Sequence, residues 1–62
     1  MPLIEVKAFE HRFNDDAKAR LLIEKLTDAL VGVYGEAARD ETWVILHGIS
    51  KERWGFGGKV RA

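Results

Sequence analysis

The chain has 62 residues, of which 47% are hydrophobic and 32% charged, and its ten basic residues balance its ten acidic ones. A chain of this length buries only about 60% of the surface that its unfolded form exposes, so the core of a single copy is marginal. Cysteine is absent, which excludes disulfides, thiolate catalysis and cysteine-based zinc sites. Self-association is therefore the expected source of further burial.

Charge and hydropathy exclude other classes of protein. The formal net charge of zero lacks the basic excess typical of small nucleic-acid-binding domains, so no nucleic-acid partner is expected. No apolar run approaches the roughly 18 residues that span a bilayer, so no membrane partner is expected either. Glu5, Lys7 and Glu10 interrupt the apolar stretch that a signal peptide needs. We expect a cytoplasmic protein.

Residues 3–9 alternate with a period of two, which predicts a β-strand. Ile4, Val6 and Ala8 share one face of it. The other face carries Leu3, Glu5, Lys7 and Phe9. Residues 10–13 read as a polar, irregular connection.

From Asp16 to about Tyr34 the apolar period becomes 3.6, which predicts an amphipathic helix. Its apolar stripe is formed by Ala19, Leu22, Leu26, Leu30 and Val33. Either Asn14 or Asp15 is a suitable N-cap. Gly35 is expected to end the helix in the left-handed conformation.

Residues 36–41 form a polar connector, and residues 42–49 are apolar on both faces and rich in β-branched and aromatic types. That composition is typical of a strand covered on both sides. Residues 50–53 read as a charged turn. The glycine-rich segment that starts at Trp54 permits a short hairpin reaching Val60.

These elements predict an α/β fold: one domain over residues 1–62, built as a single β-α-β unit with parallel strands and a C-terminal β-hairpin. One helix covers only one face of a two-stranded sheet. The other face carries apolar side chains, including Phe9 and part of residues 43–49. We therefore expect the protein to oligomerise through its sheet.

The usual catalytic sets are absent from the sequence. Ser50 is the only serine, and the glycines near the C-terminus lack the lysine-containing loop that binds phosphate. His11 and His47 lie on separate elements without ligand spacing, so both are expected to be ordinary polar residues. No metal or organic cofactor is expected.

The N-terminus offers an alternative base. Pro2 is small enough to permit removal of Met1, which would leave a secondary amine at the start of the chain. An exposed α-amino group has a pKa near 7.7–8.0. An apolar pocket and nearby guanidinium groups lower that pKa. A free Pro2 would then serve as a general base at neutral pH.

The order of these segments resembles the 4-oxalocrotonate tautomerase family over essentially the whole chain. The resemblance rests on Met1-Pro2-Leu3-Ile4 opening a strand, Glu10-His11-Arg12 ending it, a helix from Asp15, the strand Val44-Ile45-Leu46, and Trp54-Gly55-Phe56-Gly57-Gly58. It implies a β-α-β protomer, a catalytic N-terminal proline, and a hexamer built as a trimer of dimers.

By this resemblance Pro2 is the catalytic base, and Arg12 from a neighbouring subunit binds a substrate carboxylate, as a guanidinium can through two parallel hydrogen bonds. Trp54 and Phe9 fall on apolar wall positions. For Arg12 the competing interpretation is a solvated loop charge, and for Trp54 and Phe9 it is plain interface packing.

One position departs from the family pattern. The family's second active-site arginine aligns with Trp43, so a charged group that polarises the developing carbonyl is missing. Trp43 would instead help to shape a dry pocket. Arg39, Arg53 and His47 are the candidates to replace the missing charge.

The resemblance implies an enol–keto tautomerase acting on 2-hydroxydienoates or related 2-oxo acids, with a small carboxylate-bearing substrate and a homo-hexameric assembly. Assisted hydration, as in the family's 3-chloroacrylic acid dehalogenases, is the weaker option because no glutamate here matches the one that activates water. A different class of function is also open. The chain could be a non-catalytic or partner subunit of a hetero-hexamer, which provides Arg12 to another chain's site.

Overall fold

The computed structural model describes residues 1–60, so Arg61 and Ala62 of the predicted 1–62 domain lie outside the described residues. Two strands, β1 (Leu3–Phe9) and β2 (Trp43–Ile49), flank the helix α1 (Asp16–Tyr34) in the chain. Short 3₁₀ helices fill the connections, η1 (Glu10–Phe13), η2 (Glu36–Glu41) and η3 (Lys51–Arg53). The strands β3 (Gly55–Phe56) and β4 (Lys59–Val60) follow.

The strands pair as the sequence predicts. β1 and β2 are parallel, in a register that runs from Leu3 opposite Trp43 to Phe9 opposite Ile49. β3 and β4 form an antiparallel hairpin. Its two turn residues, Gly57 and Gly58, both have positive φ, 60° and 85°, as a type I′ turn requires. The predicted β-α-β unit with a C-terminal hairpin is confirmed.

The helix begins and ends near the predicted residues. Asp15 is its N-cap, and its carboxylate accepts hydrogen bonds from the backbone N–H groups of Ala17 and Lys18, at 2.9 and 3.2 Å. Gly35 follows the last turn with φ 97° and ψ 164°. Its φ is positive, as the predicted left-handed residue requires, and its ψ turns the carbonyl oxygen to accept from the Ala38 backbone N–H at 3.1 Å. Only glycine adopts this backbone conformation readily.

α1 covers one face of the two-stranded sheet. The half-buried strand residues alternate along β1 and β2 and share that face: Ile4, Val6, Ala8, Val44 and Leu46. On the opposite face Leu3, Trp43 and Ile45 are 52%, 55% and 39% exposed. In one chain, then, β2 is covered on one face only, and none of residues 1–60 is fully buried.

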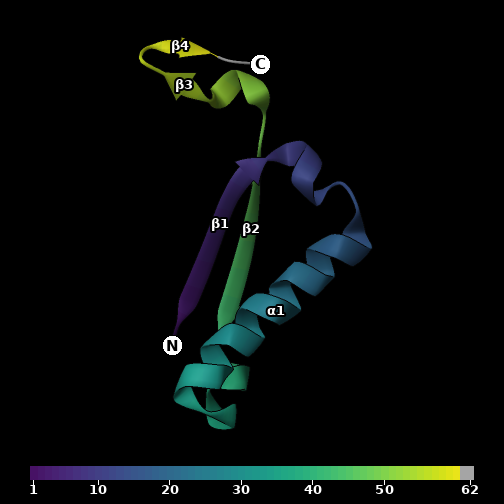
Figure 1. The fold of residues 1–62 in the computed structure, drawn as a ribbon, viewed down its shortest axis with the longest axis vertical. Coiled ribbons are helices and arrows are strands. Elements are labelled where there is room, and N and C mark those ends of the chain that lie inside the picture. The colour runs from purple at the N-terminus through teal and green to yellow at the C-terminus, as the bar shows by residue number, and fades with distance from the viewer. Residues whose placement is uncertain (61–62) are drawn as a thin grey trace.

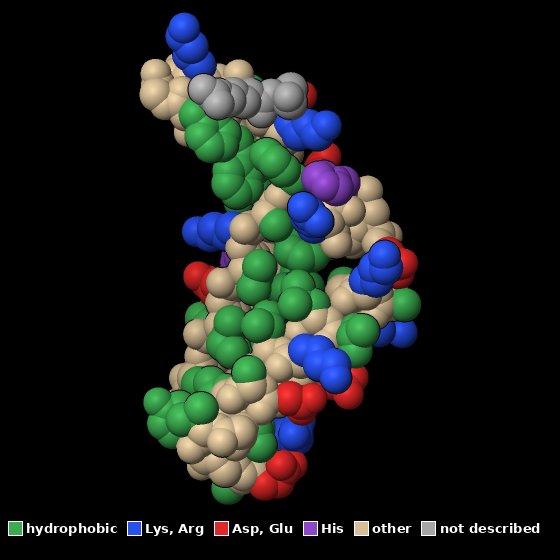
Figure 2. All heavy atoms as spheres, in the orientation of Figure 1, with side chains coloured by type: hydrophobic (Ala, Val, Ile, Leu, Met, Phe, Trp, Pro, Cys, Tyr) green, Lys and Arg blue, Asp and Glu red, His purple; other side chains and the backbone are tan. Residues whose placement is uncertain are grey.

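The protomer is open for its size. Its radius of gyration is 14.4 Å, whereas a compact domain of this length has about 11 Å. Its accessible surface is 5010 Å², against about 4,000 Å² for a compact monomer of this mass. Residues 50–60, the C-terminal arm, add to this openness, because their β3–β4 hairpin projects beyond the ends of β1 and β2 (Figure 1). Figure 2 shows hydrophobic side chains uncovered from the base of the arm to the far end of the molecule.

Candidate active site

Pro2 lies at the start of β1, directly beside the start of β2. Its carbonyl oxygen accepts a 2.9 Å hydrogen bond from the backbone N–H of Trp43. Pro2 is half-buried, whereas Met1 is 82% exposed. While Met1 is attached, the Pro2 nitrogen belongs to an amide and has no basic lone pair. Loss of Met1 converts this nitrogen into a secondary amine at the edge of the sheet.

The other predicted site residues lie at the opposite end of the sheet. Phe9 ends β1, and Arg12 follows within η1. The rings of Phe9 and Trp54 meet edge to face, with centroids 4.8 Å apart, and the Trp54 indole Nε1–H donates to the Ile49 carbonyl oxygen at 3.4 Å. Arg12 is exposed and has no ion-pair partner within residues 1–60. The end of β1 and the base of the arm thus form an aromatic pair just before the segment of the chain that carries the exposed Arg12 guanidinium.

The site residues therefore form two groups in one chain. Pro2 and Trp43 lie where the strands start, and Phe9, Arg12 and Trp54 lie where they end. A strand rises about 3.3 Å per residue, so β1 separates the groups by roughly 20 Å. Residues 1–60 of one chain also enclose no cavity. A small substrate can contact both groups only where the end of one chain meets the start of another.

Gly48 positions the segment that carries Arg12, and sequence reasoning missed this role. A Cβ atom added at Gly48 would lie 3.1 Å from the Glu10 Cα and 3.6 Å from the Phe13 ring. η1 therefore packs so close to β2 that a side chain at position 48 would force it to shift by a few tenths of an ångström. A lone glycine among the β-branched and aromatic residues of β2 is the signal that would have found it.

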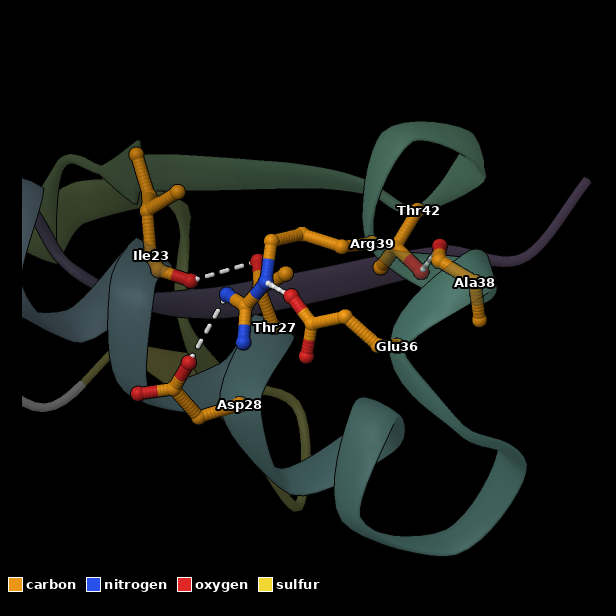
Figure 3. A network of polar contacts seen from close by, with 7 residues as sticks. All are labelled: Ile23, Thr27, Asp28, Glu36, Ala38, Arg39 and Thr42. Atoms are coloured by element: carbon orange, nitrogen blue, oxygen red, sulfur yellow. Dashed lines mark hydrogen bonds and ion pairs between the residues drawn. The ribbon is translucent and has the colours of Figure 1, made fainter.

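Arg39 is one of the three candidates to replace the missing arginine, and it is already paired. Its Nη1 lies 2.9 Å from the Asp28 carboxylate and its Nε lies 2.7 Å from that of Glu36. Figure 3 shows the guanidinium between these two carboxylates, one from α1 and one from η2. The hydrogen bonds that the Arg39 guanidinium donates to Glu36 and Asp28 raise the pKa of Arg39 above its usual value. Its charge therefore holds η2 against α1.

The other two candidates lie away from Pro2. Arg53 belongs to η3 at the base of the arm, at the opposite end of the sheet. His47 lies on the open sheet face, with its Nε2 3.5 Å from the Glu5 carboxylate. That separation is within ion-pair range, but the two atoms make no hydrogen bond, and the His47 Nε2 is buried without a hydrogen-bond partner among residues 1–60. None of the three places an unpaired cation next to Pro2.

Two properties of the described residues bear on the class of site. No group of three His, Asp or Glu side chains within residues 1–60 is arranged to hold a metal ion. Within residues 1–60, no helix has both the length and the apolar character that crossing a membrane requires.

Comparison with known proteins identifies the family. The model of the family described as tautomerase enzyme matches residues 2–62. No curated protein and no solved structure matches the chain. The match starts at Pro2, one residue before β1, and it extends over the hairpin. The chain therefore belongs to the tautomerase family.

Proposed function

We propose that this protein is an enol–keto tautomerase of the 4-oxalocrotonate type, acting on 2-hydroxydienoates or related 2-oxo acids, with Pro2 as general base after Met1 is removed. Membership in the tautomerase family indicates isomerase activity in general. The single observation that carries the finer proposal is the position of Pro2 at the matched start of the chain, directly before β1 and hydrogen-bonded to Trp43 at the start of β2.

The reaction needs only proton transfers. The neutral Pro2 amine accepts the proton of the substrate's 2-hydroxyl group while the enol oxygen becomes a carbonyl oxygen. The resulting ammonium returns a proton to a carbon of the conjugated chain, so the product is an isomer of the substrate and no oxidant or reductant is consumed. Efficient transfer requires a base whose pKa lies near the working pH.

Residues from a second copy would complete the site. Arg12 of that copy would bind the substrate carboxylate through two parallel hydrogen bonds. Phe9 and Trp54, already in contact at the same end, would form an apolar wall over the amine. An apolar surrounding and a nearby guanidinium both disfavour the ammonium form of Pro2, so its pKa would fall below that of a free α-amino group.

A homo-hexamer built as a trimer of dimers is the assembly we propose. Its support is the open sheet face and the distribution of charge along the long axis. The arm has three cations, Lys51, Arg53 and Lys59, against one anion. η2, at the other end, has Arg39 against three anions. Copies packed in opposite directions would bring unlike charges together, and complementary charge fixes register.

The excess surface of one chain also supports self-association. The protomer exposes 5010 Å², about 1,000 Å² more than a compact monomer of its mass. A stable interface of standard size buries about 800 Å² per partner. Association through the open face and the arm would therefore bring the exposed surface per chain to the usual range.

A second candidate function is a partner subunit of a hetero-hexamer that lends Arg12 to another chain's proline. The observation that favours it is the lack of an unpaired cation next to Pro2 among residues 1–60. Such a chain would complete a foreign site while its own site stayed inactive.

The test is ketonisation of 2-hydroxymuconate and of phenylenolpyruvate by protein whose mass proves that Met1 is absent, with Pro2→Ala as control. We expect turnover of at least one compound, lost in the variant. The base acts in its neutral form, so kcat/KM should rise with pH through the pKa of Pro2 and then level off. If the assembled protein without Met1 turns over both compounds no faster than Pro2→Ala does, this proposal is excluded and the partner-subunit role is favoured.

A further inference from the structure

Building on the proposed function, we infer that the site prefers 2-oxo acids with a single carboxylate and an aryl or alkyl far end over dicarboxylates. The residue that sets this preference is Trp43. The inference concerns the substrate class of the proposed site, and it rests on the side chains that surround the start of the two strands.

The open face of the sheet offers an apolar surface at the end where Pro2 lies. Leu3 and Trp43 are direct partners in the strand register and lie on the same open face. About half of each side chain is exposed, 52% and 55%. The backbone hydrogen bond from Trp43 to Pro2 fixes the indole at the same end of the sheet as the reacting amine.

No cation within residues 1–60 is available there to meet a second carboxylate. Arg39 is the nearest in the chain, four residues before Trp43, and both Asp28 and Glu36 hold it (Figure 3). The remaining charges of η2 are the anions Asp40 and Glu41. The segment that leads to Trp43 therefore repels anions.

These features penalise a dicarboxylate and favour an apolar group. One carboxylate can pair with Arg12 of a second copy, but a second one, placed against Trp43 and Leu3, would lose its hydration without gaining a partner. An aryl group in the same place buries apolar surface and meets the indole in a favourable ring geometry. Each site thus has one anion-binding end and one apolar end.

The experiment is an equilibrium binding titration with two non-reacting acids, cinnamate and trans,trans-muconate. Both are conjugated carboxylic acids, and they differ in whether the far end is a phenyl ring or a second carboxylate. We expect cinnamate to bind at least about tenfold more tightly, a difference that one charge-assisted hydrogen bond gained or lost can produce. Arg12→Ala should weaken the binding of both acids.

Three variants of the same protein test the role of Trp43. Trp43→Arg should shift the ratio of the two affinities towards muconate by about tenfold or more. Trp43→Phe should keep the preference for cinnamate. Tyr34→Arg is the matched control, because it adds the same charge at the same end of the protomer on a side chain that is 75% exposed. We expect it to leave the ratio unchanged.

The native chain alone can overturn the inference, whether or not Trp43→Arg folds. In the native protein, muconate binding as tightly as cinnamate, or no binding of either acid, would do so. Where both variants fold, an equal shift of the ratio by Trp43→Arg and Tyr34→Arg would also overturn it. Binding does not require proton transfer, so Pro2→Ala should show the native ratio. A cinnamate preference without turnover would therefore reject the proposed reaction and keep the assigned ligand class.

Discussion

The backbone N–H of Trp43 donates a 2.9 Å hydrogen bond to the Pro2 carbonyl oxygen, so β2 holds Pro2 through an atom that takes no part in the proposed chemistry. The nitrogen of Pro2 is left outside the strand pairing. The chemical state of that nitrogen can then change while the sheet stays the same.

Removal of Met1 should therefore change activity without changing stability. Met1 is 82% exposed, and changes at such surface positions usually shift the free energy of unfolding by less than about 0.5 kcal/mol. We expect chemical denaturation to give equal stabilities for protein with and without Met1, and turnover only without it. Turnover by protein shown by mass to retain Met1 would contradict the role of the free amine.

Stability should depend on protein concentration. None of residues 1–60 is fully buried in one chain, so the proposed assembly would add much of the stabilising burial. Mass action then links folding to assembly. We expect the thermal unfolding midpoint to fall on each tenfold dilution, in parallel with loss of the oligomer in analytical ultracentrifugation. A midpoint that stays constant while the protein dissociates would show that the monomer is stable alone.

Arg39→Gln should weaken the attachment of η2 to α1. The substitution removes the charge that Asp28 and Glu36 share, and the pairs are partly exposed, so the effect should be modest and sensitive to salt. We expect a lower thermal midpoint at low salt and a smaller difference at 1 M salt, where the Debye length is about 3 Å.

Arg20→Gln is the control for this change, because Arg20 is an exposed arginine of α1 without an ion pair in the described chain. The thermal unfolding midpoint of Arg20→Gln should equal that of the native protein. If Arg39 instead supplied the missing active-site charge, Arg39→Gln would lower kcat/KM strongly at any salt concentration.

Gly48→Val should destabilise the fold and impair carboxylate binding together. Even a Cβ atom there would approach the Glu10 Cα to 3.1 Å, and overpacking of this kind costs about 1–3 kcal/mol. The displaced segment is η1, which carries Arg12. We expect a lower free energy of unfolding and a higher KM for substrate.

Gly32→Ala is the matched control for Gly48→Val. An added Cβ atom at Gly32 meets no atom within 4 Å, and alanine is favoured over glycine in a helix by about 1 kcal/mol. The variant should be slightly more stable than the native protein, with an unchanged KM. Equal destabilisation by both substitutions would argue against close packing at Gly48.

Asp15→Ala should cost about 1 kcal/mol of stability, as the loss of an N-cap usually does. Its carboxylate accepts two backbone hydrogen bonds at the start of α1. Asp15→Asn keeps a capping oxygen and should retain most of the stability in a urea titration. A loss as large in Asp15→Asn as in Asp15→Ala would show that the negative charge matters more than the cap.

The main elements could be predicted because their signals are local. The period of two in residues 3–9, the Leu22–Leu26–Leu30 stripe and the Asp15 cap each depend on residues a few positions apart. The two strands and the helix accordingly lie where the sequence places them, and β2 starts one residue later than expected. The glycine pair in the hairpin turn is equally local.

The features that escaped prediction depend on distant or absent partners. Arg39 pairs with Asp28 eleven positions away, which no periodicity reveals. The extended ψ of Gly35 follows from the hydrogen bond of Ala38 within η2, which the sequence had indicated only as a polar connector. The roles of Pro2 and Arg12 depend on a second copy, so they rest on the family resemblance and await the tests above.

The length of β1 has a genetic consequence. With roughly 20 Å between Pro2 and Arg12 in every chain, a lesion at either residue disables a different half of the proposed shared site. Two defective alleles, one encoding Pro2→Ala and one encoding Arg12→Ala, would each produce inactive protein alone. Co-expressed, their products would assemble mixed particles in which some sites draw both intact residues from complementary chains, so activity would return in the cell that carries both.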